Sequence, residues 1–153
     1  MIDVQKISQL ADEFDLSLVL DRYQRDTRLP TTVVREHGRE IKRFLSMCAV
    51  SPGSYGMRGP LDDLWHTFII HTELYDNFCN KIVGNFIHHY PVVHDEADKR
   101  QSPPDESYPV FLSDYEKFFG ERAPAHIWPT PLGSGERPSC TDCGAACNHK
   151  CIA

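Results

Sequence analysis

The chain has 153 residues, a formal net charge of −6 and no run of lysine or arginine. This length suits one domain with a tail, and the lack of a basic stripe argues against nucleic acid as the main ligand. The N-terminal residues lack the basic start and apolar stretch of a signal peptide, and no apolar run reaches the roughly 20 residues of a membrane span. We therefore expect a cytoplasmic protein, not embedded in a membrane, whose six cysteines are mostly reduced.

Apolar residues recur at helical spacing near the N-terminus. They predict two short helices, or one bent helix, that end before Pro30; the residues are Ile7, Leu10, Ala11, Phe14, Leu16, Val19, Leu20 and Tyr23. An amphipathic helix over about 32–49 follows, and its apolar side includes His37 and Cys48. We expect both of these residues to face the core.

A loop of turn-forming residues at 51–60 precedes a predicted helix from 61 to about 82. Pro60 suits a helix start, and acidic residues in the first turn complement the helix dipole. One side of this helix is broadly apolar, whereas the other side mixes Asp62, His66, Ile69 and Ile70. Because two adjacent isoleucines are unusual on a solvated face, we expect both sides to be covered, at least in the first half.

Gly84 is expected to break this helix, and residues 86–91 are expected to form a further helical turn or a short helix. Residues 94–109 are polar and proline-rich, which predicts an exposed loop. A short helix at 110–120 leads into an irregular arm anchored by Ile127 and Trp128. With no alternating strand pattern, the sequence predicts an all-α domain of about five helices over residues 1–130. Residues 131–153 form a linker and a cysteine-rich tail.

The tail carries Cys140, Cys143, Cys147 and Cys151, spaced C-x2-C-x3-C-x3-C. Four thiolates this close together can surround one zinc ion, and iron–sulfur clusters use similar spacings. The alternatives are a redox tail that forms internal disulfides and a disordered tail with no role for its cysteines.

A second candidate metal site combines one carboxylate with histidines. Asp62 and His66 lie four residues apart on one helix, and the adjacent pair His88 and His89 follows the Gly84 break. Carboxylate and imidazole groups from two segments can hold a divalent metal ion. The competing interpretation is a surface ion pair between Asp62 and His66, with His88 capping a helix end.

The segments "GPLDDLWHTFIIHTELYDNFC" and "FIHHYP" resemble the bacterial branch of the glycine-rich-domain-containing-protein-like family, best known from plants. The resemblance covers residues 30–130 and implies an all-helical domain without an assigned reaction. The residues that match its pattern are Asp62, Trp65, His66, Tyr75, Phe78, Cys79, His88 and His89.

Three functions are compatible with these features. The first is an adaptor that holds zinc, most naturally in the tail, and docks another protein. The second is a metalloenzyme in which Asp62, His66 and His88 or His89 hold iron or zinc and activate a water molecule. The third is a thiol-redox or metal-delivery protein that acts through exposed tail thiolates.

Overall fold

The computed structural model describes residues 4–51, 55–90 and 107–130. Across these residues the chain is all-α, as predicted, with six α-helices, one π-helical turn and no strand. The elements are α1 (Val4–Glu13), α2 (Ser17–Thr27), α3 (Thr31–Val50), α4 (Leu61–Ile70), α5 (Thr72–Phe78), the π-helical η1 (Cys79–Val83) and α6 (Ser107–Phe119). The predicted linker and cysteine-rich tail, residues 131–153, lie outside the described residues.

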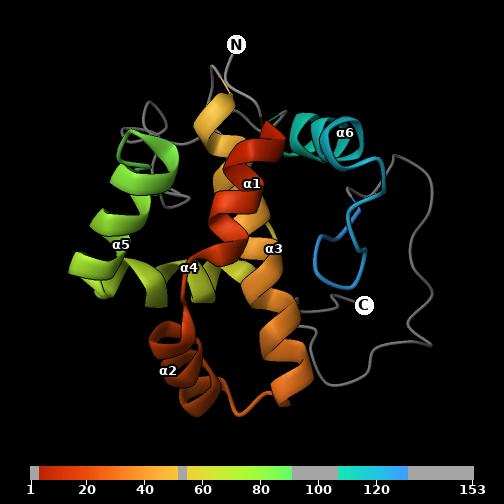
Figure 1. Cartoon of the computed structure of the whole chain (residues 1–153). Helices are drawn as coiled ribbons and strands as arrows, with labels where there is room; N and C mark the ends of the chain where they lie inside the picture. Colours follow the sequence, from red (N-terminus) through yellow and green to blue (C-terminus); the bar gives the residue numbers. More distant parts are fainter. Residues whose placement is uncertain (1–3, 52–54, 91–106, 131–153) are drawn as a thin grey trace, which may run out of the picture.

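The longest helix, α3, runs through the centre of the molecule (Figure 1). It contacts α1, α2 and α4, while α6 and residues 120–130 lie on its other side. The predicted amphipathic pattern is confirmed, because Val34, His37, Ile41, Phe44 and Leu45 are buried along α3. Cys48 is half-buried at the edge of this core.

The N-terminal region forms two helices rather than one bent helix. Asp15 lies in the turn between them, where its Oδ1 accepts a 2.9 Å hydrogen bond from the Ser17 N–H. This backbone hydrogen bond lowers the pKa of Asp15. The Lys42 ammonium donates to the carbonyl oxygens of Asp12 and Phe14, at 3.0 and 2.6 Å, and so caps the end of α1.

The predicted single helix at 61–82 is wrong, because the chain breaks at His71 into α4 and α5. His71 leaves the helical region, with φ −83° and ψ 66°, and its ring Nδ1 donates to the Thr67 carbonyl at 2.7 Å. The predicted break at Gly84 is confirmed, since Gly84 ends η1 with φ +81°. Position 71 is neither proline nor glycine, and the apolar residues keep their helical spacing across it. The sequence therefore does not indicate this break.

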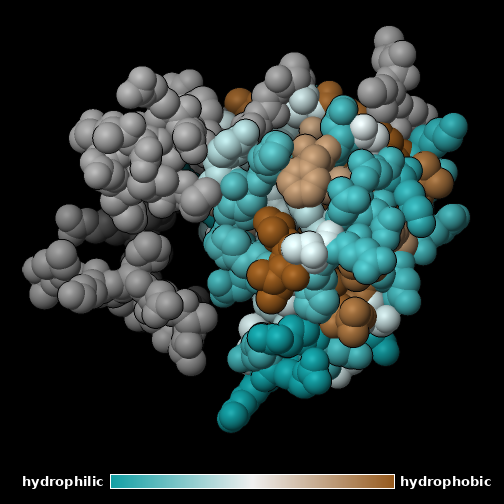
Figure 2. Space-filling model, turned by 90° about the vertical axis from the view of Figure 1, so that its left-hand side faces the viewer, coloured by the Kyte–Doolittle hydropathy of each residue, from teal (hydrophilic) through white to brown (hydrophobic). Residues whose placement is uncertain are grey.

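The prediction that both sides of this helical region are covered is only partly correct. Ile69 is partly buried, but Ile70 is 62% exposed. On the face that carries α5, apolar atoms form small separate groups among polar ones (Figure 2). A single exposed isoleucine such as Ile70 is common on the surface of a folded protein.

Two boundaries after Gly84 differ from the prediction. Residues 85–90 are not helical, and α6 begins at Ser107 rather than at 110. Pro109 therefore falls in the first turn of α6, where its missing N–H costs no helical hydrogen bond. Gly120 ends α6 with φ +68°, and Ile127 and Trp128 are buried as the predicted anchors.

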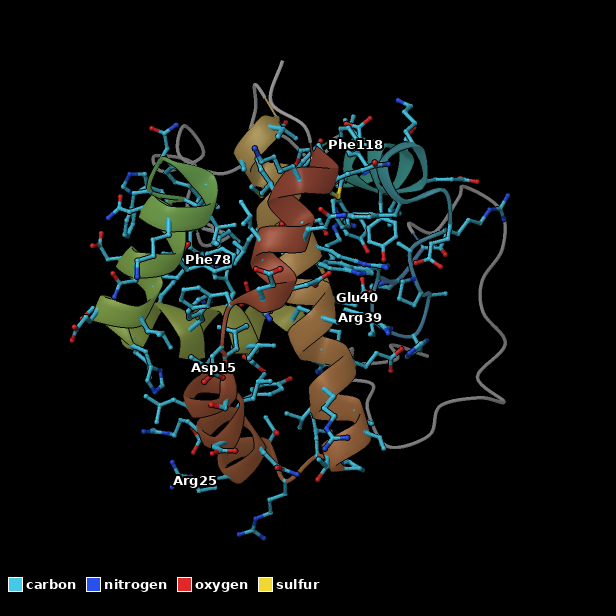
Figure 3. All side chains as sticks on the ribbon, in the orientation of Figure 1. Asp15, Arg25, Arg39, Glu40, Phe78 and Phe118 are labelled. Atoms are coloured by element: carbon cyan, nitrogen blue, oxygen red, sulfur yellow. The ribbon has the colours of Figure 1, made fainter. Side chains whose placement is uncertain are left out.

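A buried carboxylate joins α3 to the C-terminal part of the described chain. Glu40 has no exposed surface, and one of its oxygens accepts hydrogen bonds from the Tyr115 hydroxyl and the Trp128 indole N–H, both at 2.9 Å. Arg43 donates to Tyr115 and to Glu121, each at 2.6 Å. Figure 3 shows Glu40 on the side of α3 that faces residues 120–130. None of these contacts was predicted from the sequence.

His37 is buried, and its Nδ1 lies 3.0 Å from the Tyr23 hydroxyl. Burial lowers the pKa of His37, opposed by the charge of Glu36 and aided by that of His126. Because the pKa is lowered in the folded state, the unfolded chain takes up the proton at a higher pH than the folded chain does. We therefore expect the free energy of unfolding to fall as pH drops from about 6.5, the usual histidine pKa, through the lower folded-state value.

Urea unfolding at pH 7.0 and pH 5.5, with a chelator present, measures this loss of unfolding free energy at the lower pH. The loss should be smaller in His37→Gln than in the wild type. The exposed His88→Gln serves as the matched control, and it should keep the wild-type loss. An equal loss in all three proteins would contradict the assignment to His37.

Candidate metal centre

Asp62, His66 and His89 form one cluster in which a ligand atom of each lies within 4.8 Å of the other two. The first turns of α4 place Asp62 and His66 on the same face, with His66 Nδ1 3.4 Å from Asp62 Oδ2. His89 comes from the non-helical segment 85–90, and its Nε2 lies 2.9 Å from Asp62 Oδ1. The structure thus brings together a local pair and a residue 27 positions away in sequence.

The cluster has a buried wall and a solvent side. The His89 side chain is only 9% exposed, and its ring packs 4.3 Å from Trp65, measured between ring centroids. The His66 ring stacks on the His89 ring, with 4.5 Å between the two ring centroids. Asp62 and His66 are 42% and 52% exposed. The ligand atoms therefore lie between the domain core and water.

Two hydrogen bonds, one buried and one part-buried, connect α4 and α5 to the segment that carries His89. The Trp65 indole N–H donates to the Tyr75 hydroxyl at 3.1 Å, and that hydroxyl donates to the Ile87 carbonyl at 2.6 Å. Burial raises the pKa of Tyr75 well above its usual range, so its hydroxyl remains a neutral donor. Ile87, two residues before His89, is thereby fixed to α5.

Of the four residues predicted for this site, His88 does not join the cluster. Residues 87 and 89 are largely or partly buried, whereas 86, 88 and 90 are exposed. The His88 ring lies 5.0 Å from Phe86 and 6.3 Å from Tyr90. An extended segment turns successive side chains to opposite sides, which separates the two adjacent histidines.

The donor set suits a divalent transition metal. Imidazole nitrogen and carboxylate oxygen bind zinc at about 2.0–2.2 Å, so two ligands of one ion lie about 3–4 Å apart. The 3.4 Å pair has this spacing, the 2.9 Å pair is slightly shorter because it is a hydrogen bond, and one ligand atom of each of the three residues lies within 4.8 Å of the others. Two histidines and one carboxylate favour zinc or iron over magnesium or calcium, which prefer all-oxygen sites.

The other predicted metal ligands, Cys140, Cys143, Cys147 and Cys151, lie outside the described residues. The cysteines in the described part of the chain, Cys48 and Cys79, are free. Burial raises the pKa of Cys48 to about 12 and also raises the pKa of Cys79. Both thiols are therefore protonated at neutral pH and are poor nucleophiles.

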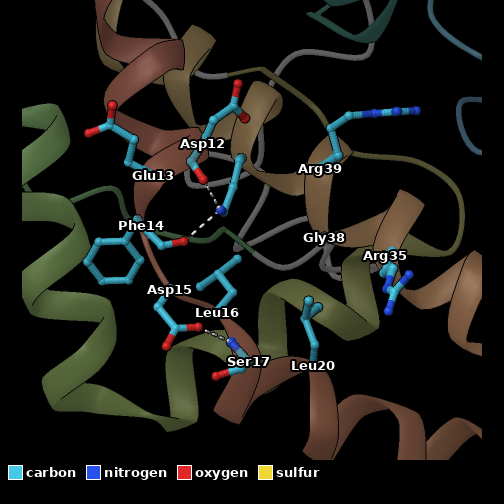
Figure 4. A pocket seen from close by; sticks show the side chains of 11 residues that line it. Asp12, Glu13, Phe14, Asp15, Leu16, Ser17, Leu20, Arg35, Gly38 and Arg39 are labelled. Atoms are coloured by element: carbon cyan, nitrogen blue, oxygen red, sulfur yellow. Dashed lines mark hydrogen bonds between the residues drawn. The ribbon is translucent and has the colours of Figure 1, made fainter.

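A separate cleft of about 540 Å³ lies between the α1–α2 turn and α3. Figure 4 shows Arg35 and Arg39 on one side of it and the turn on the other. The Lys42 ammonium within it already donates to two carbonyl oxygens. This cleft contains none of the residues predicted for a functional site.

Replacing Tyr75 by phenylalanine removes the hydrogen bond that its hydroxyl accepts from Trp65 and the one that it donates to the Ile87 carbonyl. A buried polar group left without its partner costs about 1–3 kcal/mol, so Tyr75→Phe should lower the free energy of unfolding by about that amount. Urea unfolding of the metal-free protein measures the difference. Tyr90→Phe removes the same hydroxyl from an exposed ring and should leave stability unchanged. Equal stability of the two variants would contradict a role for the Tyr75 hydroxyl.

Within the described part of the chain, no helix combines the length and apolar character needed to cross a membrane. A family model described as UCP032817-like matches residues 9–103, which include α2 to α5 and all three members of the cluster. No curated protein and no solved structure matches the chain.

Proposed function

We propose that this chain, which belongs to the UCP032817-like family, binds one divalent transition-metal ion through Asp62, His66 and His89. The observation that carries this proposal is the convergence of two imidazoles and one carboxylate from separate elements. The hydrogen-bonded Trp65–Tyr75–Ile87 chain supports it, because a ligand on a fixed segment loses little freedom when an ion binds.

Zinc is the expected ion, and iron is the alternative. Two histidines with one carboxylate occur in catalytic zinc sites and in non-haem iron sites. The resemblance to the glycine-rich-domain-containing-protein-like family is part of this proposal, since its pattern includes all three ligands with Trp65 and Tyr75. We also propose a cytoplasmic location, which the free thiols of Cys48 and Cys79 support.

The test is metal content, measured by elemental mass spectrometry on full-length protein purified without oxygen. A variant with serine at 140, 143, 147 and 151 keeps the whole chain but removes the tail thiols. It should retain about one ion per chain. His66→Gln in the same background should lose that ion, with affinity reduced by more than the roughly 10–100-fold typical of losing an outer-shell partner.

His88→Gln is the matched control, since it changes an adjacent histidine that lies outside the cluster. It should bind metal like its parent. If the serine variant binds no ion, or if His66→Gln binds as tightly as its parent, the proposed site is wrong.

A second candidate function rests on the cysteine spacing of the tail. There, Cys140, Cys143, Cys147 and Cys151 would hold zinc or an iron–sulfur cluster, and the chain would act as an adaptor that docks another protein. This candidate predicts that wild type binds one zinc ion or one iron–sulfur cluster more than the serine variant. Reversible disulfides without bound metal in the tail would favour the thiol-redox function instead.

A further inference from the structure

We propose that the ion held by Asp62, His66 and His89 keeps a coordination position open to solvent, and that a small carboxylate anion binds there. This inference rests on the proposed metal site and adds its ligand class. It concerns an exchangeable position on the ion, whereas the proposed function requires only that the ion is bound.

The first argument is the number of protein ligands. The cluster supplies three ligand atoms from the described residues, whereas zinc takes at least four ligands and octahedral iron or cobalt takes six. The neighbouring histidine, His88, is exposed and lies among the rings of Phe86 and Tyr90. Three protein ligands with a remaining exchangeable position are characteristic of reactive rather than structural zinc sites.

The second argument is the direction in which the remaining position faces. His89 is covered by the Trp65 ring and is nearly buried, so it forms the inner side of the site. Asp62 and His66 are both about half exposed. Within the described part of the chain, an ion held between these groups has the core on the side of His89 and the exposed side chains of Asp62 and His66 on the other, so that water or another small ligand can reach it.

The third argument is charge. A divalent ion with one carboxylate and two neutral imidazoles carries a net charge of about +1. A second carboxylate brings this charge to zero, and its oxygen atoms suit zinc, iron and cobalt alike. A carboxylate therefore competes with bound water for the open position.

The experiment uses cobalt(II) as a spectroscopic probe in the full-length chain with serine at the four tail cysteine positions. Acetate is titrated into the cobalt-loaded protein, with perchlorate at equal ionic strength as the weakly coordinating control. We expect a saturable change in the visible cobalt absorption with acetate and none with perchlorate. Acetate should also lower the water-proton relaxation rate of manganese-loaded protein, because it displaces bound water.

The outcomes separate this inference from the proposed function. If cobalt binds at one ion per chain but acetate leaves the spectrum unchanged, the position is closed and the inference is wrong. If His88→Gln alters the spectrum of the cobalt protein before acetate is added, His88 is a fourth ligand, which also overturns it. If cobalt does not bind at all, the metal site itself is wrong.

Discussion

Replacing Glu40 by alanine is expected to lower the free energy of unfolding by about 2–6 kcal/mol, because two buried donors lose their acceptor and each such group costs about 1–3 kcal/mol. Glu40 is fully buried and accepts from both Tyr115 and Trp128. Without it, the Trp128 N–H loses its acceptor and the hydroxyl of Tyr115 loses the carboxylate to which it donates. Urea unfolding followed by tryptophan fluorescence and by circular dichroism measures the change.

Glu121→Ala is the matched control for Glu40→Ala. Glu121 also accepts from Arg43, at 2.6 Å, but its side chain is 59% exposed. Exposed ion pairs contribute about 0–1 kcal/mol, so this variant should stay within that range of the wild type. If the two alanine variants were equally stable, the buried network would not hold α3 to the C-terminal part of the chain.

Phe44→Ala is expected to cost about 3–5 kcal/mol, as is usual when a buried phenylalanine is truncated and leaves a cavity. The Phe44 ring has no exposed surface and lies 5.2–5.7 Å from the rings of Trp65, Phe111 and Trp128. These rings come from α4, α6 and residues 120–130, so one side chain on α3 joins three parts of the fold.

The free energy of unfolding in urea measures this effect, and Leu18→Ala provides the comparison. Leu18 is an exposed apolar residue on α2, and surface substitutions usually change stability by no more than about 0.5 kcal/mol. Phe44→Leu should fall between wild type and Phe44→Ala because it fills part of the cavity. A cost for Phe44→Ala close to that of Leu18→Ala would contradict the central position of this ring.

Much of the fold could be predicted from the sequence because it depends on local periodicity. The buried side of α3 follows directly from apolar residues at helical spacing. Glu40 could not be recognised in this way, since it lies among charged neighbours such as Arg39 and Arg43. Its partners, Tyr115 and Trp128, are 75 and 88 residues away, and only the tertiary structure brings them to it.

The candidate site, like the fold, could be predicted from the sequence only where its contacts are local. Asp62 and His66 could be paired from their four-residue spacing, which one helical turn makes adjacent. The choice between His88 and His89 could not be made, because it depends on which side of segment 85–90 faces α4. The hydrogen bond between the Tyr75 hydroxyl and the Ile87 carbonyl fixes this segment, and no sequence pattern predicts that bond.

The long separation between Glu40 and its partners has a consequence for the order of folding. The contacts that α3 makes with α1, α2 and α4 close short loops, whereas the Glu40 contacts close loops of 75 and 88 residues and cost more chain entropy. On a ribosome, Glu40 is synthesised well before Tyr115 and Trp128. Its carboxylate therefore stays hydrated while the first helices assemble, and it loses its water only when the partners that replace that water arrive.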